Sequence, residues 1–153
     1  ATNLTDPNQI FDFWQYTPEA LHQITILFSD RGTPYGYRHM NGYSSHTFKW
    51  VNAEGKVHYV KYHFKTDQGI KNFTAEEQDQ MSLKDKDFST SDLYQSIEKG
   101  NFPSWTWYVQ LMPEKDADNY RFDVLDITKV WPHKDYPLHK VGKMTLNRNF
   151  IFN

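Results

Sequence analysis

The run TFKWVNAEGKVHYVKYHFK at residues 47–65 decides the fold that we expect for this chain. Its two halves, residues 47–51 and 57–65, are rich in aromatic and β-branched residues, which favour extended strands. Residues 52–55, Asn-Ala-Glu-Gly, separate the halves and are typical of a hairpin turn. We therefore predict an antiparallel hairpin, and because strand side chains alternate between faces, His63 and Lys65 should share one face.

Two helices are predicted before the hairpin. Asp6 and Pro7 combine an N-cap oxygen acceptor with a ring that suits the first helical turn, and the same signal recurs at Thr17 and Pro18. The second segment carries apolar residues at helical spacing up to Phe28. Residues 31–36 contain two glycines and a proline, which predict a turn-rich loop.

Two more helices and several strands are predicted after the hairpin. Thr74 and Glu77 form a capping-box pattern that starts a polar helix towards Leu83. Thr90 or Ser91 is expected to cap the next helix, which should end at a left-handed Gly100. Residues 105–112, 120–125 and 141–146 have strand-like patterns.

This order predicts an α+β fold with an antiparallel sheet. The predicted strands are too few to close a barrel comfortably, so we expect the chain to supply part of one.

Composition narrows the possible functions. The 153 residues match the usual size of one domain, and the chain contains 5 Trp, 10 Tyr and 11 Phe, each able to bury a large apolar area. The absence of cysteine excludes disulfides and thiolate metal sites. A net charge of −2 disfavours nucleic acid as a partner. No apolar run is long enough to span a membrane, and no secretory leader opens the sequence, which begins at Ala1.

Two catalytic interpretations have weak support. The seven histidines show no HExxH pattern or other tight ligand spacing, so we predict no metal site. The run Ser44-Ser45-His46 lacks the spacing and the GxSxG elbow of a serine hydrolase.

A polar and aromatic cluster gives the stronger signal. Its early members follow the second predicted helix within thirteen residues, and its last two lie on the predicted hairpin. Arginine and lysine can hold phosphate, whereas histidine and tyrosine can stack on a base or hydrogen-bond a ribose. No glycine-rich phosphate loop is present, so side chains would have to hold a nucleotide. Solvated surface charges are the alternative explanation. The members are Arg31, Arg38, His39, Asn41, Tyr43, His63 and Lys65.

Several longer stretches of the sequence resemble the haem catalase family, and they follow one another over nearly the whole chain. They are FSDRG at residues 28–32, HMNGY at 39–43, SHTFK at 45–49, KTDQGIKN at 65–72, PSWT at 103–106, TKVWPH at 128–133, VGK at 141–143 and LNRN at 146–149. These motifs are similar to those of small-subunit, NADPH-binding catalases such as the fungal ones.

The resemblance implies an antiparallel β-barrel with inserted helices, of which residues 1–153 form a partial core domain carrying later barrel strands. It also implies an enzyme that dismutates hydrogen peroxide to water and oxygen at a haem. The family's distal histidine and asparagine belong before Ala1, and its axial tyrosine belongs after Asn153. We therefore assign no catalytic residue and no metal ligand to this chain. His46 matches a histidine that supports the axial tyrosinate from the proximal side.

The resemblance further implies an NADPH site on the outside of the barrel. Where the family has a phenylalanine in this site, Ile26 keeps an apolar wall but loses the ring. The ten matching positions are His22, Ser29, Arg31, Asn41, Tyr43, His63, Lys65, Val130, Trp131 and His133.

Three further expectations follow from the resemblance. The parent protein should be a homotetramer in the peroxisome or cytoplasm. The end of the chain, Phe-Ile-Phe-Asn at residues 150–153, departs from the family pattern, which suggests a truncation, a misread end or a cloning scar. Two alternatives to a catalase segment stay open: a non-enzymatic module that binds a dinucleotide or another anion, and an incomplete, inactive fragment.

Overall fold

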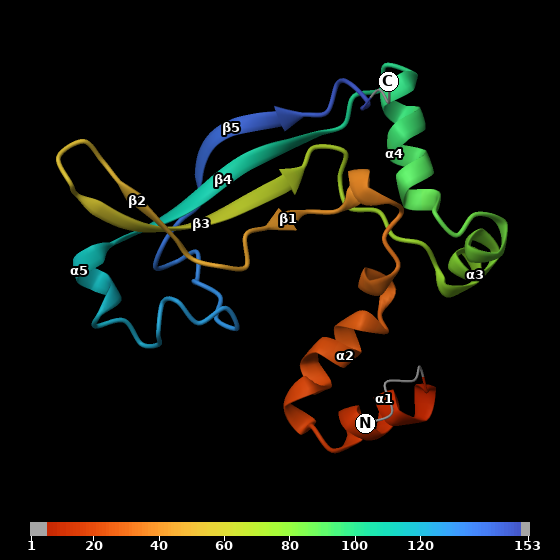
Figure 1. The fold of residues 1–153 in the computed structure, drawn as a ribbon, viewed down its shortest axis with the longest axis horizontal. Helices are drawn as coiled ribbons and strands as arrows, with labels where there is room; N and C mark the ends of the chain where they lie inside the picture. The colour runs from red at the N-terminus through yellow and green to blue at the C-terminus, as the bar shows by residue number, and fades with distance from the viewer. Residues whose placement is uncertain (1–5, 151–153) are drawn as a thin grey trace.

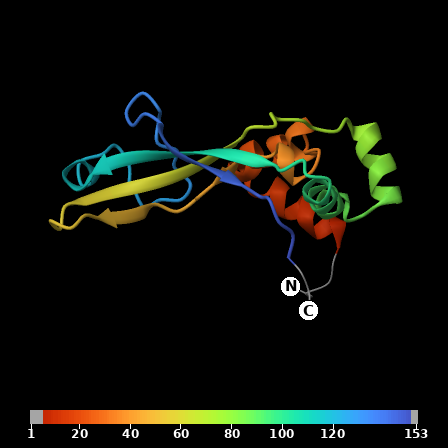
Figure 2. The ribbon, with the colours of Figure 1, turned by 90° about the horizontal axis from the view of Figure 1, so that it is seen from above.

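The computed structural model describes residues 6–150 of the chain. The divergent residues 151–153 lie outside the described part. Mixed helices and an antiparallel sheet make up the molecule, as predicted. Figure 2 shows the long strands extending to one side and the helices gathered at the other. The strands are β1 (Gly42–Tyr43), β2 (Phe48–Val51), β3 (Val57–Thr66), β4 (Ser104–Pro113) and β5 (His139–Thr145).

Strand β3 is the centre of the sheet. It pairs with β4 along one side, and with both β1 and β2 along the other. Strand β5 then pairs with the far side of β4, and every pairing is antiparallel. Figure 1 shows the resulting open sheet, with β5 at one edge and β1 and β2 at the other. Within the described residues the sheet does not close on itself, which agrees with part of a larger barrel.

The predicted hairpin is confirmed as β2 and β3. The Asn52 side-chain oxygen accepts hydrogen bonds from the backbone N–H groups of Glu54 and Lys56, at 3.1 and 2.8 Å. Gly55 has φ +77°, a left-handed conformation that glycine adopts without steric cost. The sequence of the turn therefore sets the register of the long strand that follows.

Both helices before the hairpin are confirmed, although only one is capped as predicted. The Asp6 carboxylate accepts from the Asn8 N–H at 2.9 Å and begins α1 (Pro7–Gln15). The second segment begins with a single 3₁₀ turn before α2 (Leu21–Leu27), and Thr17 makes no side-chain cap. Phe11, Trp14 and Phe28 pack their rings together and join the two helices into an arm that leaves the sheet (Figure 1).

The next two helices lie at the opposite end of the sheet from the hairpin turn (Figure 1). Helix α3 (Ala75–Lys84) begins with the predicted capping box of Thr74 and Glu77. Helix α4 (Phe88–Glu98) begins before Thr90 and Ser91, so the predicted N-cap is wrong. The ring of Phe88 packs edge-on against Tyr35, a tertiary contact that the local sequence does not reveal.

The C-terminal end of helix α4 agrees with the sequence-based prediction better than its start does. Gly100 follows the C-cap residue Lys99 and has φ +78°, as predicted.

The predicted strand at residues 120–125 is wrong. After the short helix α5 (Glu114–Ala117), the chain continues through turns. The Asp123 carboxylate accepts from the Leu125 N–H at 2.9 Å, a local bond that competes with strand pairing. The aromatic residues of this segment instead pack on a buried cluster beneath the sheet. That cluster consists of Met112, Val124 and Trp131, with Tyr59, Ala117, Tyr120, Phe122 and Tyr136 packed against it.

The other two strand predictions are largely confirmed, as β4 and β5. The short strand β1 was not predicted, because two residues carry no periodic pattern. Trp105 and Val109 on one face of β4 are buried, but so are Gln110 and Met112 on its other face. Strand β4 is therefore covered on both sides, which the alternating pattern alone did not indicate.

Asp67 ties together the ends of three strands. Its carboxylate accepts hydrogen bonds from the hydroxyls of Thr106 and Ser104 at 2.6 and 2.7 Å, and pairs with Lys143 at 3.3 Å. The two hydroxyl donors, together with the lysine charge, lower the pKa of Asp67 to about 2. This exposed carboxylate therefore stays ionised and fixes how β3, β4 and β5 meet.

Replacing Met112 with alanine should destabilise the fold. Met112 is fully buried in the cluster with Val124 and Trp131. We expect the free energy of unfolding to fall by about 2–5 kcal/mol, because the lost side chain leaves a cavity. Urea unfolding followed by tryptophan fluorescence measures the change. Leu125→Ala, at a residue 56% exposed in the neighbouring loop, is the control and should change stability little; equal losses in both variants would contradict the assigned core.

Candidate functional site

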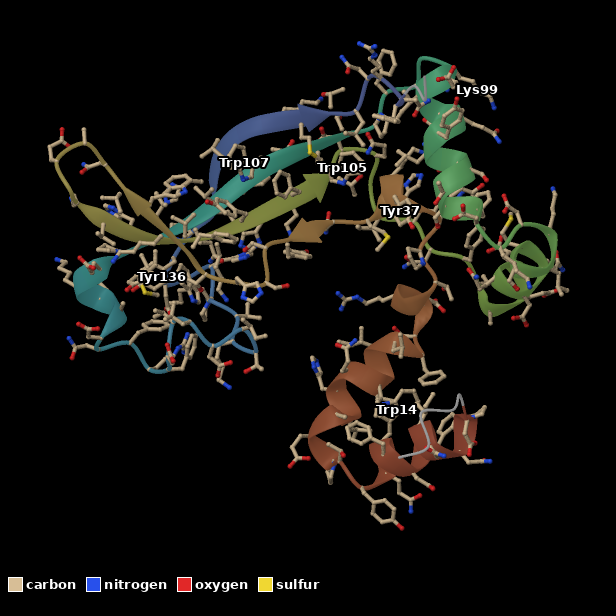
Figure 3. All side chains as sticks on the ribbon, viewed as in Figure 1. Trp14, Tyr37, Lys99, Trp105, Trp107 and Tyr136 are labelled. Atoms are coloured by element: carbon tan, nitrogen blue, oxygen red, sulfur yellow. The ribbon has the colours of Figure 1, made fainter. Side chains whose placement is uncertain are left out.

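A pocket of about 390 Å³ lies on one face of the sheet, between β1, β3 and β4 and the loop that leads to β5. Figure 3 labels Tyr136 in this loop region, on the opposite side of the strands from β5 in that view. The lining consists of Tyr43, Ser44, Ser45, Lys61, Tyr62, His63, Lys65, Gln110, Ile127, Lys129, Val130, Trp131 and His133.

Alternation along β3 places three cationic or titratable side chains at the pocket. Lys61, His63 and Lys65 are spaced two residues apart, so they project from one face of the strand. Their neighbours Tyr62 and Phe64 contact Trp107 on the other face. The chain therefore separates a polar face from an aromatic face within one strand.

Two buried side chains hold the loop over this face. Gln110, 1% exposed, donates from its amide nitrogen to the carbonyls of Trp131 and Tyr136, at 3.1 and 2.6 Å. Lys61 donates from Nζ to the Lys129 carbonyl at 2.8 Å. These bonds bring residues 129–136 against β3 and β4, although they are far away in sequence.

Lys61 is a buried cation at the base of the pocket. Its residue is 8% exposed, and its Nζ lies 5.5 Å from the centre of the Trp131 ring. Burial lowers the pKa of Lys61, and the negative charge of Asp126 opposes only part of this effect. An anion bound nearby would favour the charged form of this amine.

Tyr43, Asn41 and Lys65 form a connected polar group at the rim. The Tyr43 hydroxyl accepts from Lys65 Nζ at 2.9 Å and from the Asn41 amide at 3.3 Å. Burial alone would raise the pKa of Tyr43, but these two donors and the charges of Lys65 and Arg31 lower it below its usual value. The field around this hydroxyl is therefore positive.

His63 lies between two rings within the pocket. Its imidazole makes edge contacts with the rings of Tyr43 and His133, at centroid distances of 5.5 and 5.9 Å. Burial lowers the pKa of His63, and the charges of Lys65, His133 and Lys61 lower it further, against the hydrogen bond to Gln110. The ring is therefore neutral at ordinary pH. Its Nδ1 atom is buried and has no hydrogen-bond partner within residues 6–150.

The structure brings most of the ten predicted binding residues together. Asn41 is one hydrogen bond from the pocket lining, and the charge of Arg31 acts on Tyr43. His22 on α2 and Ser29, two residues after the end of that helix, lie outside the lining. Six residues line the pocket directly: Tyr43, His63, Lys65, Val130, Trp131 and His133.

His46 lies elsewhere, in the connection between β1 and β2. It is exposed, and its backbone N–H donates to the Ser44 carbonyl at 2.6 Å. Ser45 beside it has φ +55°, an uncommon conformation for a residue with a side chain. The local backbone is therefore tightly turned at this point.

Sequence reasoning missed seven residues of the pocket lining, and two of them, Lys61 and Gln110, hold the loop against the sheet. Lys61 could have been found, because it shares the two-residue spacing of His63 and Lys65 on the predicted strand. Gln110 carried no such signal, since its partners lie in a loop that only the tertiary structure brings near.

The remaining candidate sites show fewer features of a binding or catalytic site. Across residues 6–150, no three His, Cys, Asp or Glu side chains gather as metal ligands do. The absence of a metal site stays a prediction that nothing in these residues contradicts. None of the helices in that range has the length and apolar character needed to cross a bilayer. A second pocket, of about 360 Å³, lies along α3 and α4, where Arg38 and Asp92 form a two-bonded ion pair.

Comparison with known proteins gives one consistent family. A family profile described as Catalase matches residues 1–151. The chain is 59% identical to a catalase of Methanosarcina barkeri over 97% of its length, and 57% identical to one of Rattus norvegicus. A protein named peroxisomal catalase from Toxoplasma gondii is 53% identical. The chain covers 30%, 28% and 30% of these relatives, respectively.

Comparison with solved structures indicates the same family. Catalase A from Saccharomyces cerevisiae superposes with a TM-score of 0.88 at 52% identity, covering 99% of this chain and 31% of that one. A bacterial catalase gives the same TM-score at 51% identity, covering 97% of this chain and 29% of its own. The chain thus spans less than a third of the catalases that it matches.

Replacing Lys65 with methionine should raise the pKa of Tyr43. The substitution removes both a hydrogen-bond donor and a positive charge that favour the phenolate, while the burial that opposes ionisation remains. NMR of protein carrying ¹³Cζ-labelled tyrosine would follow the titration, with Tyr43→Phe identifying the resonance. Lys56→Met, at an exposed lysine of the hairpin turn, is the matched control and should leave the pKa of Tyr43 unchanged. An unchanged or lower pKa in Lys65→Met would refute the assigned contact.

Proposed function

The chain belongs to the catalase family, and on that premise we propose that it is a segment of a haem catalase whose pocket holds NADPH. The parent enzyme would convert two hydrogen peroxide molecules to two of water and one of oxygen. Residues 1–153 would then form part of its core domain. Six predicted contact residues from three separate stretches of sequence line one pocket, and this observation carries the dinucleotide proposal.

Haem is the cofactor that family membership implies. The resemblance assigns none of the family's distal or axial positions to residues 1–153. The remaining parts of the parent protein would have to supply those groups. We assign His46 only a supporting role, through hydrogen bonds on the proximal side of the haem.

The pocket residues do fit a dinucleotide phosphate. Lys65 and Arg31 provide the positive field at the rim, where phosphate groups would lie. Lys61 adds a buried amine whose lowered pKa would recover beside an anion. Val130, which is 77% exposed, provides apolar surface for a ring, with the buried Trp131 beside it in the lining.

His133 and Asn41 offer further polar contacts, and His22 and Ser29 would join the site from α2. Bound NADPH would supply the reducing equivalents that protect a catalase from inactive oxidised states.

A second candidate function is a binding module without enzymatic activity. It is favoured by the fact that Lys61, His63, Gln110 and Trp131 assemble the pocket from this chain alone. Such a module would hold NADPH or another anion without haem. An incomplete, inactive fragment is the remaining alternative.

The proposed parent enzyme has further partners. It would act on hydrogen peroxide, assemble as a homotetramer and work in the peroxisome or the cytoplasm. Nucleic acid and membranes are not proposed as partners.

Alanine at Arg31 or Lys65 should weaken NADPH binding. Each lost charged hydrogen bond is expected to remove about 1.5–3 kcal/mol, which corresponds to roughly a 10- to 150-fold increase in Kd. Isothermal titration of the complete protein with NADPH measures this change. Lys56→Ala is the matched control, because Lys56 is exposed at the hairpin turn and away from the pocket. Unchanged affinity in both pocket variants would remove these residues from the site.

The isolated chain should neither bind haem with a Soret band nor release oxygen from peroxide. The resemblance places the distal and axial groups, which would hold the iron and act on the O–O bond, outside residues 1–153. Absorption spectroscopy and an oxygen electrode test this, with the complete protein as the positive control. Tight NADPH binding by the haem-free chain would favour the binding module, and no binding would favour the incomplete fragment. Full catalase activity of the isolated chain would exclude our assignment.

A further inference from the structure

Gln110 donates both of its amide hydrogens to backbone carbonyls. Its Nε2 donates to Trp131 at 3.1 Å and to Tyr136 at 2.6 Å. A flipped amide would place its oxygen against these two carbonyl oxygens, where no hydrogen could join them. The orientation of the Gln110 side chain is therefore determined by its surroundings.

The oxygen of Gln110 consequently faces His63. Its Oε1 lies 2.9 Å from His63 Nε2, and an amide oxygen only accepts hydrogen bonds. Nε2 must therefore carry the ring proton. His63 is 8% exposed, and because burial and the charges of Lys65, His133 and Lys61 favour its neutral form, Nδ1 carries no proton.

The remaining ring nitrogen is an acceptor without a donor. His63 Nδ1 is buried and has no hydrogen-bond partner among residues 6–150, although the residue lines the pocket. A buried polar atom left in this state is unfavourable until a partner reaches it. The rings of Tyr43 and His133 contact the imidazole, and both of these residues are exposed to solvent.

We propose that Gln110 is a positioning residue that holds His63 as the Nε2-protonated tautomer, so that Nδ1 accepts a hydrogen bond from a neutral N–H or O–H donor of the bound ligand. This assignment separates His63 from the cations around it. Arg31, Lys61 and Lys65 suit phosphate oxygens, whereas an unprotonated Nδ1 repels them. The identity of the ligand in this inference rests on the proposed dinucleotide function. The tautomer of His63 does not depend on that function.

NADPH carries three groups of the required kind. They are the nicotinamide carboxamide, the adenine amino group and the ribose hydroxyls. Each presents a neutral donor, and the experiment below distinguishes them. None of the three is a phosphate.

The tautomer is tested without any ligand. In complete protein labelled with ¹⁵N-histidine, the His63 Nδ1 resonance should have the shift of an unprotonated nitrogen and Nε2 that of a protonated one, with the assignment made from His63→Gln. Gln110→Met should let the Nδ1-protonated form appear, which a purely structural role of Gln110 would not produce. A protonated Nδ1 in the unsubstituted protein overturns the inference, whether or not NADPH binds.

Two substitutions of His63 test the acceptor. His63→Asn places an oxygen near the position of Nδ1, whereas His63→Gln reproduces Nε2 and its bond to Gln110 but offers no acceptor at Nδ1. We expect His63→Gln to weaken NADPH binding about tenfold and His63→Asn to weaken it much less. The reverse order would overturn the inference, while NADPH binding to neither variant nor the unsubstituted protein would defeat the proposed function alone.

Lowering the pH gives an independent test of the acceptor at His63 Nδ1. Below its lowered pKa, His63 gains a proton on Nδ1 and loses its acceptor, so NADPH binding should weaken relative to His63→Asn. The other charged or titratable side chains that face His63, namely Lys61, Lys65 and His133, are the same in both proteins, so the comparison isolates His63. A phosphate at Nδ1 would instead strengthen binding on acidification, which would overturn the inference.

Ligand analogues then identify the donor. An acetylpyridine analogue of NADPH lacks the carboxamide N–H, and a hypoxanthine analogue lacks the adenine amino group. The analogue that lacks the relevant donor should bind the unsubstituted protein and His63→Gln equally well. Sensitivity of both analogues to His63→Gln assigns the contact to a ribose hydroxyl, and equal binding of NADPH itself to both proteins overturns the inference.

Discussion

The central position of β3 is the constraint on which the rest of the structure depends. This strand is paired on both sides, so its backbone groups are occupied and each side chain must point to one face of the sheet or the other. Lys61, His63 and Lys65 therefore face the pocket together, while Tyr62 and Phe64 join the aromatic face with Trp107. A shift of register by one residue would exchange the two faces and remove the site.

Electrostatics gives the polar face its character. Lys61 is held by a backbone carbonyl and by the face of Trp131 rather than by a paired carboxylate, and Lys65 is held by a tyrosine hydroxyl. Cations whose contacts are neutral retain capacity for an anionic ligand. Gln110 contributes in another way, because one buried amide joins the loop to the sheet and also sets the polarity of the histidine beside it.

The aromatic face explains why we place this chain inside a longer protein. Phe48 is 45% exposed and Trp50 is 39% exposed, although both contact Tyr62 within a continuous aromatic group. Large apolar side chains gathered on one open face favour burial against another surface. The sheet is also unclosed, and the catalases that resemble this chain are more than three times as long. These observations agree with the proposal that the neighbouring segments of a catalase complete the barrel.

The sequence by itself determined the features that depend on near neighbours. Asn52 and Gly55 predict the hairpin turn, Thr74 and Glu77 predict the cap of α3, and the family motifs indicate a catalase. These were predictable because a turn or a cap is formed by residues a few positions apart. The strand predicted at 120–125 failed because a local hydrogen bond of Asp123 and packing on the buried cluster replaced strand pairing. The start of α4 was misplaced, and its first residue, Phe88, packs on the distant Tyr35. Only the tertiary structure brought Gln110 and the loop at 129–136 to His63, because hydrogen bonds between residues far apart in sequence leave no local pattern from which to predict them.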